Sequence, residues 1–121
     1  MDNNKKLLLV SDKKKFRDLA GQVLRKNFNV KFASGGFHAL HLIEEEDFQM
    51  VVIVGNSEEM PAIELITLLR TGHNQKDLPI LFLYSKGSTE MLDAIEAGAN
   101  GYLPISQNLN PLVKKIQEIA K

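Results

Sequence analysis

The chain has 121 residues, 44% of them hydrophobic, which fits one ordinary domain over residues 1–121 with its own core. Its 15 basic and 15 acidic residues cancel, so no overall field draws it to nucleic acid or to an anionic membrane. The absence of cysteine excludes a disulfide framework and a thiolate zinc site. The opening residues lead into only four apolar residues, too few for a signal peptide or a membrane span, so we expect a soluble cytoplasmic protein.

Short apolar runs alternate with amphipathic stretches along the whole chain. The runs have the length and composition of buried strands, and we expect strands over 5–10, 30–33, 48–54, 78–84 and 100–103. The stretches between them have helical spacing, and we expect helices over 13–26, from 37 into the acidic group 44–47, over 61–71, between 88 and 98, and over 109–119. The strand over 48–54 is apolar enough to be buried on both faces, whereas the weaker strand over 30–33 is expected at an edge.

Several residues are expected to mark the ends of these helices. Asp12 and Ser88 are placed to cap the first and fourth helices, Pro61 suits a first helical turn, and Gly98 suits the end of the fourth helix. In the fourth helix the apolar residues predicted to face inward are Met91, Leu92, Ile95 and Ala97. Five strand and helix pairs in succession predict a parallel sheet with right-handed crossovers, hence a three-layer α/β sandwich.

Five landmarks occur in a recognisable order and spacing: 7–12, 36–40, the valine run from 51, 78–81, and the Ala-Gly-Ala-Asn-Gly-Tyr segment 97–102. Together they resemble the receiver domain of bacterial response regulators, and the last is the most specific. The resemblance covers essentially the whole chain. It implies a flavodoxin-like fold with strand order 2-1-3-4-5.

The resemblance also implies a phosphorylation pocket at the carboxyl edge of the sheet. Receivers accept a phosphoryl group on an aspartate at the end of the third strand, with a magnesium ion held partly by two acidic residues after the first strand. The matching positions here are Val54 for the acceptor and Ser11 with Asp12 for the acidic pair. Valine cannot form an acyl phosphate, and one carboxylate plus the main-chain oxygen of Asn56 would hold magnesium poorly.

Two further positions depart from the family pattern. The small hydroxyl residue that ends the fourth strand in receivers is matched by bulky Tyr84, with Ser85 beside it, and the lysine after the fifth strand is matched by Ile105. The chain therefore looks like a degenerate, or pseudo-receiver, domain with no catalytic residue, no cofactor and no metal site.

The aromatic switch residue of receivers is retained as Tyr102, and we expect Tyr84 to lock it in one position. The implied function is docking of a protein partner, or of a second copy, without phosphorylation and without binding nucleic acid or membrane. The face involved would be made by the fourth helix, the fifth strand and the fifth helix. Family position and helical spacing place these residues on it: Glu90, Met91, Ala94, Tyr102, Gln107 and Lys115.

Two other function classes stay open at this point. One is a phosphotransfer regulator with a relocated acceptor, for which Glu58 and Glu59 are candidate replacement acids. The other is a sensor that holds an anion or nucleotide beside the lysines 13–15, which stand where a helix dipole disfavours them. Asp12 is read either as a helix cap or as a remaining metal ligand. His38 and His41 share a helical face, but no third metal ligand is indicated.

Overall fold

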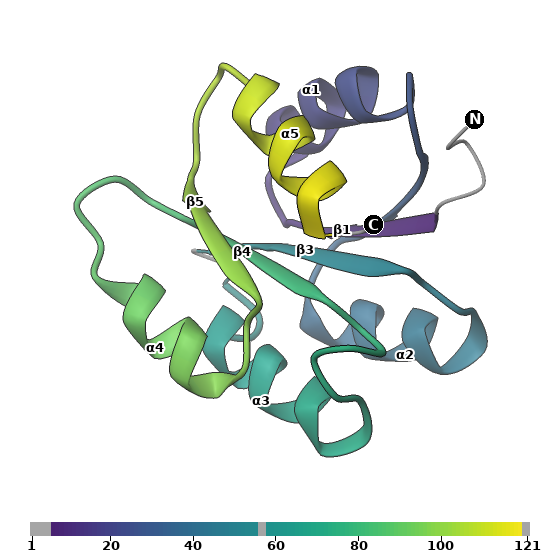
Figure 1. The fold of residues 1–121 in the computed structure, drawn as a ribbon, viewed down its shortest axis with the longest axis vertical. Coiled ribbons are helices and arrows are strands. Elements are labelled where there is room, and N and C mark those ends of the chain that lie inside the picture. The colour runs from purple at the N-terminus through teal and green to yellow at the C-terminus, as the bar shows by residue number, and fades with distance from the viewer. Residues whose placement is uncertain (1–5, 56–57, 120–121) are drawn as a thin grey trace.

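The computed structural model describes residues 6–55 and 58–119, in which helices and strands alternate from one end to the other (Figure 1). The strands are β1 Lys6–Val10, β2 Asn29–Ala33, β3 Met50–Val54, β4 Ile80–Tyr84 and β5 Gly101–Pro104. The helices are α1 Lys14–Leu24, α2 Gly36–Glu45, α3 Ala62–Gly72, α4 Glu90–Ala97 and α5 Asn110–Ile119. All the predicted elements are present, with ends displaced by a few residues.

The strands form one parallel sheet in the order β2-β1-β3-β4-β5. This is the predicted flavodoxin-like order, and it places β2 at an edge as expected. All five residues of the central strand β3 are buried, because helices cover the sheet on both faces.

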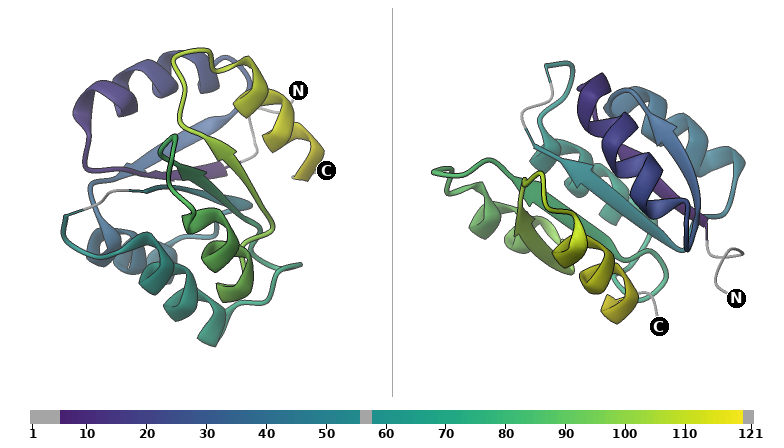
Figure 2. Two further views of the ribbon diagram at one scale, coloured as in Figure 1. Left: turned by 90° about the vertical axis from the view of Figure 1, so that its left-hand side faces the viewer. Right: turned by 90° about the horizontal axis from the view of Figure 1, so that it is seen from above.

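Alternate residues of β3 face two separate apolar layers. Met50, Val52 and Val54 belong to a cluster completed by residues of α1 and α5. Val51 and Ile53 belong to a second cluster completed by residues of α2, α3 and α4. Figures 1 and 2 show this arrangement, with α1 and α5 together on one face of the sheet and the other three helices on the opposite face.

The helix ends correct some of the predicted caps. Asp12 does not cap α1, because the N-cap position belongs to Lys13, whose backbone N–H donates to the Ser11 hydroxyl at 3.1 Å. Pro61 stands at the N-cap of α3, one residue before the helix begins. Ser88 precedes the N-cap of α4 by one residue, although its hydroxyl does accept a hydrogen bond from the N–H of Glu90 at 3.1 Å.

Arg70, in the last turn of α3, ties together the loops at the amino edge of the sheet. Its guanidinium donates to the carbonyl of Gly98 and to that of Leu78, each at 2.8 Å, and to Oδ1 of Asn100 at 2.8 Å. Gly98 ends α4 as predicted, with φ of +123°, and an added Cβ would lie 2.6 Å from the Arg70 side chain. Glycine is thus required there both for the backbone conformation and for space.

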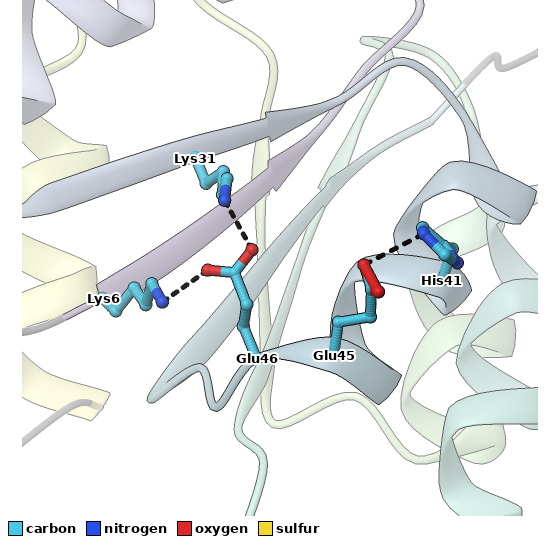
Figure 3. Close-up of polar contacts among 5 residues, drawn as sticks. All are labelled: Lys6, Lys31, His41, Glu45 and Glu46. Atoms are coloured by element: carbon cyan, nitrogen blue, oxygen red, sulfur yellow. Dashed lines mark hydrogen bonds and ion pairs between the residues drawn. The ribbon is translucent and has the colours of Figure 1, made fainter.

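A second polar link lies where β1, β2 and the end of α2 meet. The Glu46 carboxylate lies 2.5 Å from the ammonium of Lys6 and 2.5 Å from that of Lys31 (Figure 3). Hydrogen bonds from Lys31 and Lys6 hold the pKa of Glu46 below its ordinary value. The neighbouring pair of His41 and Glu45, 3.0 Å apart, lies on the exposed surface of α2.

No helix within residues 6–55 and 58–119 is both long and apolar enough to cross a membrane.

Candidate functional site

The carboxyl ends of the strands bring several of the predicted site residues to one edge of the sheet. Backbone hydrogen bonds continue past the ends of β1 and β5, from Ser11 N–H to the Ala33 carbonyl at 3.0 Å and from Ile105 N–H to the Tyr84 carbonyl at 2.8 Å. Because parallel strands all end at the same edge, Ser11, Val54, Tyr84 and Ile105 gather there although they are far apart in sequence.

Val54, the last residue of β3, is only 4% exposed. It belongs to the apolar cluster that includes Leu83 from β4 and Leu112 from α5, with Leu103 and Ile105 packed against it. The strand end at the centre of this edge therefore offers a hydrocarbon surface. A valine side chain can neither attack phosphorus nor bind a cation.

Asp12 provides the carboxylate nearest the end of β1, and it is already engaged by protein groups. Its Oδ2 accepts a hydrogen bond from the N–H of Glu58 at 2.9 Å, and its Oδ1 lies 3.2 Å from the ammonium of Lys13. The hydrogen bond from Glu58 is the main cause that lowers the pKa of Asp12, with a smaller contribution from Lys13, while burial opposes the shift. Asp12 thus links α1 to the loop after β3.

Among the described residues, the side chains at this edge offer few free oxygen ligands to a magnesium ion, which requires near-octahedral coordination by oxygen. Asp12 supplies one engaged carboxylate, and the Ser11 hydroxyl accepts the hydrogen bond from Lys13. The carboxylate of Glu59 is also engaged, because it accepts the N–H of Phe37 at 3.1 Å in the first turn of α2. Asn56 lies outside the described residues.

Among the described residues, no group of three histidine, cysteine, aspartate or glutamate side chains is arranged to hold a metal ion. His38 and His41, considered as a helical pair from the sequence, have separate partners. Nδ1 of His38 accepts the N–H of Ser34 at 3.1 Å, and His41 pairs with Glu45.

Tyr84 and Tyr102 lie side by side on β4 and β5. Their ring centroids are 5.9 Å apart with 60° between the ring planes, an edge-to-face arrangement of the kind that aromatic pairs favour. Tyr102 is 42% exposed, whereas Tyr84 is half-buried against the cluster of α2, α3 and α4. The next residue, Ser85, is half-buried, and its carbonyl accepts the N–H of Ser88 at 3.0 Å.

The six predicted partner-binding residues do not form one exposed set. Tyr102 is exposed, and the side chains of Glu90, Met91 and Lys115 are half-buried. Ala94 is wrongly predicted, because it is fully buried where α4 packs on β4 and β5. Gln107 is exposed, but it lines a hollow with Phe16 and Leu19 of α1.

Two apolar residues of α4 that were predicted to face inward are exposed instead. Leu92 is 67% exposed and Ile95 is 41% exposed. Helix α4 packs through Ala94, which is fully buried, and through half-buried Ala97, whose three-residue spacing and small side chains let the helix approach the sheet closely. These two alanines were the signal in the sequence that could have given the correct face.

Comparison with known proteins identifies the family. The sequence profile of the response regulator receiver domain matches residues 7–117. The chain belongs to the response regulator receiver domain family. The curated relatives of this receiver include the chemotaxis protein CheY-3 of Vibrio cholerae, which is 30% identical over 122 residues, 98% of this chain and 94% of CheY-3.

Solved receiver structures have the same fold. The chemotaxis response regulator CheY4 of Vibrio cholerae superposes with a TM-score of 0.83 at 26% identity, covering 94% of this receiver and 97% of CheY4. The receiver domain of Ssk1 from Saccharomyces cerevisiae, solved with the histidine phosphotransfer signalling protein Ypd1, superposes with a TM-score of 0.86. The Ssk1 receiver is 23% identical to this receiver, and the superposition covers 99% of this receiver and 91% of the Ssk1 chain. At this level of identity the similarity shows the fold alone.

Proposed function

We propose that this receiver is a protein-interaction module of two-component-type signalling that works without phosphorylation at the end of β3. We further propose that residues 1–121 act as one domain, in the cytoplasm, and that the domain is not an enzyme. The main support for the proposal is that Val54, at the position where the family resemblance implies the phosphoacceptor aspartate, is apolar and buried.

The surroundings of Val54 support the same reading. The carboxylate that follows β1, Asp12, is held by the N–H of Glu58 and the ammonium of Lys13, and no group of three potential metal-ligating side chains is present among the described residues. Ile105, where the family resemblance implies a lysine, packs against the apolar cluster of α1 and α5. An acyl phosphate cannot form on Val54, and Ile105 provides no cation that would stabilise a phosphoryl group.

The surface formed by α4 and β5 is the proposed docking face. Leu92, Ile95 and Tyr102 leave apolar surface exposed to solvent, and half-buried Met91 lies on the same helix. Large exposed apolar side chains gathered on neighbouring elements are typical of protein-binding surfaces. The proposed occupant is a protein partner, with a second copy of the receiver as an alternative. The Ssk1 receiver bound to Ypd1 illustrates that this fold can dock proteins.

Incubation with acetyl phosphate, or with beryllofluoride and magnesium, tests the first part of the proposal. We expect no mass increase and no saturable amide shifts near Val54 and Tyr84. A stoichiometric adduct would reject the proposal in favour of a receiver with a relocated acceptor. Peptide mapping of the adduct would then identify that acceptor.

The docking face is tested with surface variants that leave the core untouched. We expect Leu92→Ser combined with Tyr102→Ala to abolish capture of a protein partner by the immobilised domain. The matched control is Leu68→Ser on α3, which removes a 39% exposed leucine from another face and should leave capture unchanged. Equal loss in both variants would contradict the assignment of the face. Sedimentation of the free domain separates a second copy from a different partner.

A further inference from the structure

Two adjacent apolar hollows lie on the opposite side of the sheet from α4, between α1 and the start of α5. The α5 hollow, of about 200 Å³, has a lining that includes Phe16, Leu83, Lys86, Ser106, Leu109 and Leu112. The α1 hollow, of about 280 Å³, is lined by Lys15, Phe16, Leu19, Ile105, Ser106 and Gln107. Phe16 and Ser106 line both, so the hollows are neighbours on one surface.

The floor of the α5 hollow is part of the hydrophobic core. Leu83, Leu109 and Leu112 are all at least nine-tenths buried, and they belong to the same apolar cluster as Val54. Such a surface favours hydrocarbon over water in proportion to the apolar area covered. The absence of a charged side chain at positions 54 and 105 leaves this end of the core apolar up to the surface.

The polar side chains of the loop before α5 are used to shape it. Oγ of Ser106 accepts the N–H of Asn108 at 3.1 Å, and Oδ1 of Asn108 accepts the N–H of Asn110 at 3.2 Å. These short-range turns fix the rim between the hollows. The rim is therefore formed before a ligand arrives, which reduces the entropy lost on binding.

Each hollow has one lysine in its lining, and neither lysine has a carboxylate partner in the part of the chain that the structure describes. Lys13 pairs with Asp12 and Lys14 with Asp18, at 3.2 and 3.0 Å. Within residues 6–55 and 58–119, by contrast, no carboxylate lies within ion-pair distance of the ammonium of Lys15 in the α1 hollow or of Lys86 in the α5 hollow. The charge left uncompensated at the hollows is positive.

We propose that these hollows bind a small amphiphilic carboxylate, with its hydrocarbon part in the α5 hollow and its carboxylate toward Lys86 or Lys15. The volume of the α5 hollow is below the roughly 300 Å³ at which sites for drug-sized ligands begin, so the hydrocarbon part is a short acyl chain or a single ring. A nucleotide fits less well, because its phosphates need several N–H donors and Lys13 and Lys14 are already paired.

The test uses octanoate as probe and 1-octanol as its uncharged counterpart, titrated into the full chain and followed by amide NMR shifts. We expect saturable octanoate shifts confined to Leu83, Leu103 and the segment 104–112. The charge contribution should make octanoate bind about fivefold more tightly than 1-octanol, the upper range for a pair at an exposed site. Equal binding of the two probes, shifts centred elsewhere, or no saturable shift would overturn the proposal.

Surface variants locate the charge without disturbing the core. The double variant Lys15→Glu with Lys86→Glu should weaken octanoate binding about fivefold or more. The control double variant Lys26→Glu with Lys76→Glu makes the same change in net charge at exposed positions outside both hollows, and it should bind as the natural chain does. Equal weakening in both double variants would contradict the assignment.

A filling variant tests the apolar part separately. Ser106→Trp places a large side chain at the exposed residue shared by both hollows, and we expect it to abolish the octanoate shifts while the remaining spectrum stays that of the folded chain. Unchanged octanoate binding would place the ligand elsewhere. These experiments probe a different face from the docking variants on α4, so failure of one proposal leaves the other to be judged by its own test.

Discussion

Replacing Val54 by aspartate places a carboxylate at the end of β3, and the structure predicts that the ionised side chain will destabilise the folded protein. Val54 is 4% exposed within an apolar cluster. Burial in such a site disfavours the ionised form and raises a carboxyl pKa by about 3 units. Since each unit corresponds to about 1.36 kcal/mol, the ionised side chain should cost about 4 kcal/mol of folding stability at pH 8.

The control is Val54→Asn, which has a similar shape and polarity but does not ionise. Both variants lose the packing of the valine, so the difference between their free energies of unfolding isolates the charge. Because burial raises the pKa of the new aspartate in the folded state, the full loss of stability is present at pH values above that folded-state pKa. The loss disappears as the pH falls toward the unfolded-state pKa of about 3.9. Urea unfolding of both variants at pH 8 and pH 4 measures the difference.

Two results would refute this reasoning. If Val54→Asp and Val54→Asn were equally stable at pH 8, the site would be hydrated or compensated by a cation. If millimolar magnesium stabilised the aspartate variant but not the asparagine variant, the edge would hold enough oxygen ligands for the metal. Either result would weaken the proposal that the loss of the phosphorylation chemistry extends beyond residue 54.

Three further predictions concern the polar links of the fold. Arg70→Lys keeps the charge but loses the planar set of donors that reaches Leu78 and the other loop acceptors. Urea unfolding should therefore show a free energy of unfolding lower by about 2 kcal/mol. An unchanged urea midpoint would contradict the role of this residue. Because the pKa of Asp12 is lowered in the folded state, its stabilisation is present above about pH 4 and is lost as pH falls through the folded pKa. Asp12→Asn should therefore flatten the pH dependence of stability in that acid range, and an unaltered profile would show that the bond from Glu58 does not depend on charge. Glu46→Gln should make the thermal unfolding midpoint less sensitive to added salt, because it removes the carboxylate shared by Lys6 and Lys31. An unchanged salt dependence would show that these ion pairs do not contribute to stability.

The fold was predictable from the sequence because its elements depend on short-range patterns. The apolar run within 48–54 predicted a strand buried on both faces, the weaker run over 30–33 predicted an edge strand, and both were confirmed. Family resemblance supplied the strand order. Leu92 and Ile95 were placed on the wrong side of α4, since a helix of eight residues gives too few turns for periodicity to choose between faces.

The site was less accessible to sequence reasoning because its contacts join distant segments. The Asp12 carboxylate binds the N–H of Glu58, 46 positions away, whereas a local pattern suggested a helix cap. Glu59 caps the first turn of α2 from another loop, so a candidate replacement acid turned out to have a structural partner. The hollows beside α5 arise from the packing of α1 against the loop before α5, which no single segment encodes.

The way α4 is held has a consequence for how binding on its surface would be transmitted. Its last turn is fixed by Gly98, whose carbonyl accepts a hydrogen bond from Arg70, while its first turn follows a loop in which Gly87 has φ of +88° and open space around it. The middle of α4 is held against β4 and β5 by the fully buried Ala94. A force applied at Leu92 would therefore reach the sheet by two routes, through Ala94 and through the loop back to Tyr84, whose ring meets that of Tyr102 edge to face.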